Sequence, residues 1–177
     1  SEPNAMSTET HDAHIETHLL ESPRIDVVRV ASPGERLAAL EIRRRVFAEE
    51  QGVADLRVAD PDDDRSVIAL ATFNQTWADR IEARPVSTGR LTLPSQKGGQ
   101  ALIAWVATLP EARSRGVGGQ VMRFLLDAAD RAGAREVALA AQLPAENFYR
   151  RLGFSPAGPV YDVRGIPHRR MIRRGPN

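Results

Sequence analysis

The residues best suited to chemistry form an arginine- and glycine-rich stretch, Arg113 to Gly119. It follows an apolar run that ends before Pro110, and it opens a segment with helical patterning at 120–132. The first N–H groups of a helix have no partner inside it, and the helix dipole adds about half a positive charge at that end. An anion is stabilised there. The natural ligand of this stretch is therefore a phosphate.

The composition of the stretch supports a phosphate ligand. Gly116, Gly118 and Gly119 have no Cβ atom, so the turn can take positive φ values and a bulky diphosphate can approach the main chain. Arg113 and Arg115 would add charged hydrogen-bond donors. A glycine-rich turn whose arginines are merely solvated is the alternative.

Two better-known phosphate loops do not fit these residues. The P-loop requires lysine and then serine or threonine after its last glycine, whereas this chain has Gln120 and Val121. The dinucleotide-binding pattern requires Gly-x-Gly-x-x-Gly in the first strand–helix unit, and the glycines here are spaced differently. A loop that binds phosphate here would thus belong to another class.

The pattern Arg113-x-x-Gly116-x-Gly118, between a strand and a helix, resembles the acetyl-CoA pyrophosphate loop of the GNAT superfamily of N-acetyltransferases. The run at 145–154 is similar to that family's helix ending in Phe-Tyr-x-x-Leu-Gly-Phe. Two further motifs, Val46 to Val53 and Gly165 to His168, resemble the ElaA-like branch of the family. Together the matches cover roughly residues 25–172.

The resemblance implies acetyl-CoA as co-substrate. The strand at 101–109 would splay from its neighbour, so that its last main-chain groups bind the pantetheine and polarise the acetyl carbonyl. An ordinary core strand followed by Pro110 is the alternative. The implied cofactor-binding positions are Val106, Ala107, Thr108, Arg113, Ser114, Arg115, Gly116, Val117, Gly118, Gly119, Gln142 and Phe148.

Acetyl transfer to an amine needs an acid for the departing sulfur, and a base or a dry pocket for the amine. The resemblance implies that Tyr149 is the acid, and its phenol is protonated at neutral pH; a core tyrosine is the alternative. Glu50 and His168 are both candidates for the base, directly or through water. Their alternatives are a surface glutamate at a helix end and a strand histidine paired to the main chain.

The chain departs from the family pattern at three positions. Gln142 stands where many members have asparagine, and Ser66 lies near where a histidine is common. Trp105 stands where the ElaA-like branch usually has an arginine on the central strand. Because a charged position becomes a large apolar one, the resemblance does not identify the acceptor.

The segments that must position these residues alternate between strand and helix patterns. Residues 74–85 are expected to form a long hairpin connection. Asp60 to Asp64 is expected to be an acidic loop, either a solvated turn or an entrance for a cationic amine. The arginines at 43–45 are expected to be solvated on a helix. Strands are expected at 25–30, 67–73, 86–93, 101–109, 137–141, 154–158 and 166–172, and helices at 35–50, 118–132 and 145–152.

This alternation predicts a mixed α/β layer. The resemblance sharpens the expectation to the GNAT-type acyl-CoA N-acyltransferase fold (α/β, α+β mixed), with a central mixed, mostly antiparallel sheet flanked by helices. The length of 177 residues predicts one domain, at 24–177. The polar segment before it, 1–23, is expected to be disordered. Its first five residues precede Met6, and we interpret them as a cloning remnant.

Composition narrows the possible partners. The chain has no cysteine, which excludes disulfides and thiolate zinc sites. His11, His14 and His18 lie in the tail and are interpreted as incidental, so no metal is expected. The net charge of +1 gives no argument for nucleic acid. No apolar run approaches the roughly 20 residues of a membrane span. We expect a cytoplasmic protein, with a homodimer possible.

The sequence thus predicts an acetyl-CoA-dependent N-acetyltransferase that moves an acetyl group to a primary amine by direct attack in a ternary complex. The alternative is a non-catalytic acyl-CoA-binding module in which Trp105 blocks the acceptor pocket. The presence of Tyr149 favours the enzyme, because a module that only binds has no use for an acid at the sulfur. The acceptor stays open among small amines, polyamines, amino sugars and protein termini.

Overall fold

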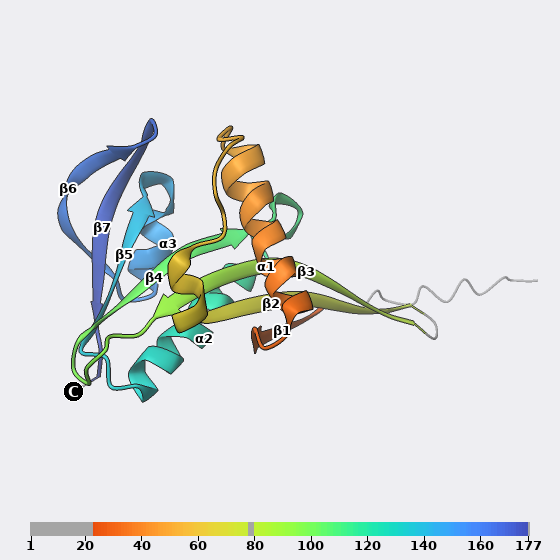
Figure 1. The fold of residues 1–177 in the computed structure, drawn as a ribbon, viewed down its shortest axis with the longest axis horizontal. Helices are drawn as coiled ribbons and strands as arrows, with labels where there is room; N and C mark the ends of the chain where they lie inside the picture. The colour runs from red at the N-terminus through yellow and green to blue at the C-terminus, as the bar shows by residue number, and fades with distance from the viewer. Residues whose placement is uncertain (1–22, 78–79, 177) are drawn as a thin grey trace, which may run out of the picture.

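The computed structural model describes residues 23–77 and 80–176. They form one seven-stranded sheet in the order β1-β2-β3-β4-β5-β7-β6, in which β4 and β5 run parallel and all other neighbours antiparallel (Figure 1). The predicted mixed, mostly antiparallel sheet is confirmed. The predicted disordered tail, with its histidines, lies outside the described residues except for Pro23. The strands are β1 (Arg24–Arg29), β2 (Val67–Trp77), β3 (Arg80–Thr92), β4 (Gln100–Thr108), β5 (Glu136–Gln142), β6 (Ser155–Val163) and β7 (Ile166–Arg174).

The longest helical segments cover opposite faces of the sheet. Successive residues of a strand point to opposite faces. In β2, Ile68 and Leu70 pack in the core cluster that includes α1, whereas Ala69 and Ala71 pack in the cluster that includes α2. The described chain contains no helix long and apolar enough to cross a membrane. The helical segments are α1 (Pro33–Arg43), η1 (Arg44–Glu50), η2 (Pro61–Arg65), η3 (Pro110–Ala112), α2 (Val117–Arg131), η4 (Leu143–Ala145) and α3 (Glu146–Arg151).

The predicted helix at 35–50 is confirmed as a continuous run made of α1 and η1. Ser32 and Glu35 form a reciprocal capping box, which satisfies N–H groups at the start of α1. After Arg43 the chain continues as the wider π-helix η1, which contacts β4. Segments of π-helix are frequent at functional sites. Here the segment carries Phe47 and Glu50 to the side of β4.

The prediction of a long hairpin connection at 74–85 is wrong. β2 continues to Trp77 and β3 begins at Arg80. Figure 1 shows the two strands extending together beyond the rest of the sheet. Residues of β3 are exposed as far as Pro85 and buried from Val86 onward. The predicted start at Val86 therefore marks the point at which β3 becomes buried.

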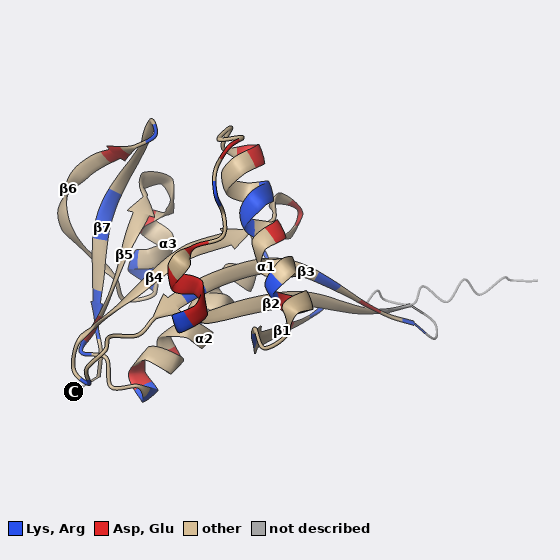
Figure 2. Cartoon of the chain, viewed as in Figure 1, with Lys and Arg blue, Asp and Glu red and all other residues tan. Residues whose placement is uncertain are grey.

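The expectation of a solvated arginine run is wrong for Arg43, although Arg44 and Arg45 are accessible. The acidic segment is the expected turn before a strand, except that Asp63 is buried. Arg43 is fully buried, and its guanidinium donates to both carboxylate oxygens of Asp63 at 2.9 and 3.0 Å. Arg43 lies four residues after Ala39, so the two share the face of α1 that packs on the sheet. The acidic segment is a helical turn, red in Figure 2, rather than an open entrance. Its other acids pair as Asp60 with Arg90, Asp62 with Arg65, and Asp64 with Arg36.

Candidate active site

The sheet opens between β4 and β5. The two strands pair only where Gln100–Leu102 meets Glu136–Ala138; beyond this point β4 pairs with β3 alone, and β5 with β7. Figure 1 shows the two strands diverging. A cavity of about 660 Å³ occupies the gap, with lining from both strands and from η1. The predicted splay at the end of this strand is therefore present.

The main chain of β4 directs some of its groups toward this gap. The carbonyl of Ala107 accepts from the Ser87 hydroxyl of β3 at 3.0 Å, and the N–H of Leu109 donates to the carbonyl of Val86 at 2.8 Å. Because main-chain groups alternate in direction along a strand, those of Val106 and Thr108 point the other way, toward the gap. Of the three predicted residues, Val106 and Thr108 are the ones with main-chain groups directed there.

The predicted phosphate loop joins β4 to α2. Ser114 and Gly116 take positive φ values of 63° and 78°, and α2 begins at Val117 without a side-chain cap. Among the described residues no acceptor is found for the N–H groups of Val117, Gly118 and Gly119. A Cβ on Gly118 would lie 3.3 Å from Oγ1 of Thr108 and 3.6 Å from Cζ of Phe148. The loop therefore presents unpaired donors and leaves little room at Gly118.

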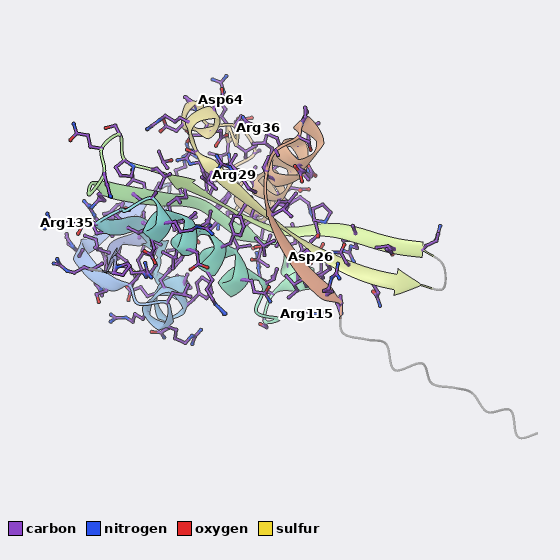
Figure 3. The ribbon with its side chains drawn as sticks, turned by 90° about the horizontal axis from the view of Figure 1, so that it is seen from below. Asp26, Arg29, Arg36, Asp64, Arg115 and Arg135 are labelled. Atoms are coloured by element: carbon purple, nitrogen blue, oxygen red, sulfur yellow. The ribbon has the colours of Figure 1, made fainter. Side chains whose placement is uncertain are left out.

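The two arginines of the loop have different surroundings. Arg113 lines the cavity, donates to both carboxylate oxygens of Glu50 at 2.7 and 2.9 Å, and donates through Nε to the carbonyl of Thr108 at 3.1 Å. Arg115 lies over the Phe73 ring at 5.9 Å and lines a separate cavity of about 280 Å³. Figure 3 shows Arg115 near the base of the β2–β3 hairpin. Only Arg113 thus lies where β4 and β5 separate.

Tyr149 lies in the wall of the main cavity. The side chain comes from α3, is 8% exposed and packs edge-on against Phe148 and Phe154. Burial raises the pKa of its phenol to about 12. The hydroxyl therefore keeps its proton throughout the neutral range. Gly153, with a φ of 95°, ends this helical segment as expected from the sequence.

Of the remaining predicted residues, Gln142, Glu50 and His168 line the cavity, whereas Phe148 and the loop residues at 114–119 are not among its described lining residues. Gln142 and Gln51 exchange side-chain amide hydrogen bonds of 3.2 Å across it. Nδ1 of His168 lies 2.7 Å from the carbonyl of Ile166, and its ring stacks on Tyr161. A carbonyl can only accept, so Nδ1 donates, and in the neutral imidazole Nε2 carries the lone pair. Both base candidates, Glu50 and His168, therefore line one cavity.

Trp105 lies at an irregularity in β4. Its φ of 56° is left-handed, and between Ala104 and Ala107 β4 has one residue more than the partner strand β3. Such bulges redirect side chains and are frequent beside active sites. The indole N–H donates to Asp60 at 3.2 Å, the Arg43 guanidinium lies 5.0 Å from the ring centre, and Phe47 packs edge-on at 5.3 Å. Trp105 thus forms a fixed part of the cavity wall.

Several lining residues were not singled out from the sequence. Phe47 and Gln51 belong to the ElaA-like motif, so a signal existed, but it gave no role for either side chain. Val163 reaches the cavity from β6, and nothing local in the sequence indicates this. Within 23–77 and 80–176, no group of three histidine or acidic side chains is arranged to hold a metal ion.

Comparison with known proteins agrees with this geometry. Residues 37–154 match the family described as the acetyltransferase (GNAT) family. The chain is 29% identical over 136 residues to YjcF of Bacillus subtilis (strain 168), named an uncharacterized N-acetyltransferase, covering 76% of this chain and 89% of YjcF.

Two crystal structures extend the comparison. Escherichia coli ElaA is 25% identical, with a TM-score of 0.70, over 86% of this chain and 99% of ElaA. An acyl-CoA N-acyltransferase from Pseudomonas aeruginosa is 29% identical, with a TM-score of 0.69, over 86% of this chain and 99% of that one. The predicted resemblance to ElaA is confirmed. Because the matched family segment spans more than half of the chain, this protein belongs to the acetyltransferase (GNAT) family.

Proposed function

We propose that the protein is an acetyl-CoA-dependent N-acetyltransferase that acetylates a primary amine by direct attack in a ternary complex. The observation that carries the proposal is the opening between β4 and β5, which has Arg113 and Tyr149 in its wall. The start of α2, with its unpaired N–H groups, lies beside this wall, because Gly118 lies against Thr108. The unpaired strand edge suits the amides of pantetheine, and the helix start suits a diphosphate. The residues therefore fit an acyl-CoA.

The bond changes of the reaction determine which roles the side chains must fill. The amine nitrogen bonds to the acetyl carbon, the carbon–sulfur bond breaks with its electron pair going to sulfur, the sulfur gains a proton and the nitrogen loses one. We assign the sulfur's proton to Tyr149, whose phenol stays protonated because burial raises its pKa to about 12. The main chain of Val106 and Thr108 would orient the thioester and stabilise charge on its oxygen.

We assign the amine's proton to His168. Its Nδ1 is held by the Ile166 carbonyl, which leaves Nε2 to accept. Both oxygens of Glu50 are instead engaged by Arg113. Glu50 would then hold Arg113 beside the loop, while His168 acts as the base directly or through water.

A pH–rate comparison tests this assignment. A base must be unprotonated to act, so the wild-type kcat/KM should fall at low pH. In His168→Asn this acidic limb should disappear and kcat/KM should drop by roughly a hundredfold or more. Glu50→Gln should keep the limb. If Glu50→Gln removes the limb and His168→Asn keeps it, Glu50 is the base.

Substitution of Gly118 tests the phosphate loop. Gly118→Ala should raise the Kd for CoA at least about tenfold, or about 1.4 kcal/mol, because the new methyl group would lie only 3.3 Å from Oγ1 of Thr108, where the loop meets β4. Gly34→Ala is the matched control, since Gly34 is likewise the second residue of a helix but has no atom within 4 Å of its added Cβ. Titration calorimetry with CoA measures both. Equal affinities in the two variants would remove the loop from the binding site.

The non-catalytic acyl-CoA-binding module remains the second candidate, because Trp105 occupies the cavity wall. CoA binding without acetyl transfer to any amine in a broad panel would establish it. A cytoplasmic location and a homodimer stay predictions.

A further inference from the structure

We propose that the acceptor is a primary amine carrying an aromatic or other flat apolar group, and that Trp105 and Phe47 form the surface that receives this group. The inference rests on the N-acetyl transfer proposed above, and it narrows the acceptor class that the sequence left open. It depends on the polarity of the cavity, on the arrangement of the two rings and on the contacts that fix Trp105.

The cavity offers little to a strongly polar acceptor. Among its described lining residues Glu50 is the only acid, and both of its oxygens are engaged by Arg113. The amides of Gln51 and Gln142 are engaged with each other. A polyamine would therefore meet no unpaired carboxylate, and an amino sugar few free hydrogen-bonding partners. Much of the wall is apolar, and its apolar residues include Val46, Phe47, Trp105 and Val163.

The two aromatic rings are arranged to receive a third. Their centres are 5.3 Å apart and their planes are inclined by 80°, the edge-to-face geometry that aromatic groups prefer. Both side chains are half-buried and both line the cavity. A flat apolar group placed against them would gain the same kind of contact while its amine extends toward Tyr149 and His168.

Contacts from outside the cavity hold Trp105 in place. Its indole N–H donates to Asp60, and the buried guanidinium of Arg43 lies against the ring. Arg43 is itself fixed by its two hydrogen bonds to Asp63. The ring is thus positioned before any ligand arrives, and a preorganised surface loses less freedom on binding. Trp105 is therefore a specificity-determining residue.

The test compares acceptors at saturating acetyl-CoA. We expect wild-type kcat/KM for 2-phenylethylamine to exceed the values for spermidine and glucosamine by at least about tenfold. Trp105→Ala should lower kcat/KM for 2-phenylethylamine roughly tenfold to a hundredfold, with little effect on spermidine, whereas Trp105→Phe should retain most of the preference. Leu102→Ala is the control, since it removes an exposed side chain from the same strand outside the cavity.

CoA calorimetry and thermal unfolding accompany each assay. If Trp105→Ala does not fold, Phe47→Leu carries the same expectation of a reduced preference for 2-phenylethylamine. Transfer to spermidine or glucosamine at rates equal to or above those for 2-phenylethylamine would overturn the inference and leave the proposed transferase intact. CoA binding with no transfer to any amine overturns both in favour of the binding module. Absence of CoA binding removes the proposed function itself.

Discussion

Replacing Tyr149 by phenylalanine should lower kcat by roughly two to four orders of magnitude, with the Kd for CoA unchanged. The substitution removes only the hydroxyl and keeps the ring that packs between Phe148 and Phe154. The departing sulfur would then lose its proton donor. Steady-state kinetics at saturating acetyl-CoA measure kcat, and calorimetry measures the Kd.

Tyr161→Phe provides the matched control, because Tyr161 is the chain's other tyrosine and lies 42% exposed on β6. Its loss of a hydroxyl should leave kcat unchanged. Because burial raises the pKa of Tyr149 to about 12, the wild-type profile should also show no loss from this group at neutral or mildly alkaline pH. An unchanged kcat in Tyr149→Phe would mean that another group protonates the sulfur.

Asp63→Ala should reduce the free energy of unfolding by about 3–5 kcal/mol. Arg43 is fully buried, and without Asp63 its charge would keep only the hydrogen bond to the Val58 carbonyl and a weaker contact with the Trp105 ring. An uncompensated buried charge is far more costly than a lost surface contact. Denaturant unfolding followed by circular dichroism measures the difference.

Asp64→Ala is the control next to it in sequence. Asp64 pairs with Arg36 at 2.9 Å, but its side chain is 90% exposed. Both residues are labelled in Figure 3. Removing this pair should change the unfolding free energy by less than about 1 kcal/mol. Equal losses in the two variants would show that the burial of Asp63 is not what makes its ion pair matter.

The pH dependence of stability gives a second check on Asp63. Burial alone would raise its pKa, but hydrogen bonds from Arg43 and from the N–H of Asp60, with the charge of Arg43, lower it below the ordinary 3.8. A carboxyl whose folded pKa is depressed stabilises the protein above its unfolded pKa. This stabilisation should therefore be lost in the wild type as the pH falls below about 4, and it should be absent at every pH in Asp63→Ala.

The buried parts of the fold could be predicted from the sequence because burial leaves an apolar pattern. The strands from Val67 and Ala101 and the helix with Val121 and Leu125 all lie close to their predicted positions. The outer part of β3, from Arg80 to Pro85, is exposed and contains a glutamate and a proline, residue types that are uncommon in strands, so the sequence does not predict it as one. The burial of Arg43 could not be predicted, because a charged residue gives no local sign of a partner twenty positions away.

In the candidate site too, features with a local sequence pattern could be predicted and contacts between distant positions could not. The loop at Arg113–Gly119 and Tyr149 stand in contiguous motifs, so their positions could be predicted. The pairing of Arg113 with Glu50, and of Gln142 with Gln51, joins segments 63 and 91 positions apart. Such contacts depend on how the sheet opens, which no local pattern describes. The side-chain direction of Trp105 depends likewise on the bulge in β4.

The short pairing between β4 and β5 has a wider consequence. Within the described chain, these three-residue segments are where main-chain pairing joins the two halves of the sheet. The halves are thus paired at one end, while at the other end no β-ladder joins the described residues of β4 and β5. A molecule that bridges the free ends supplies the cross-links that a continuous ladder would have had. Binding of such a molecule would complete the link between the two halves of the sheet. The stability of the protein should then rise with the fraction of sites that are occupied.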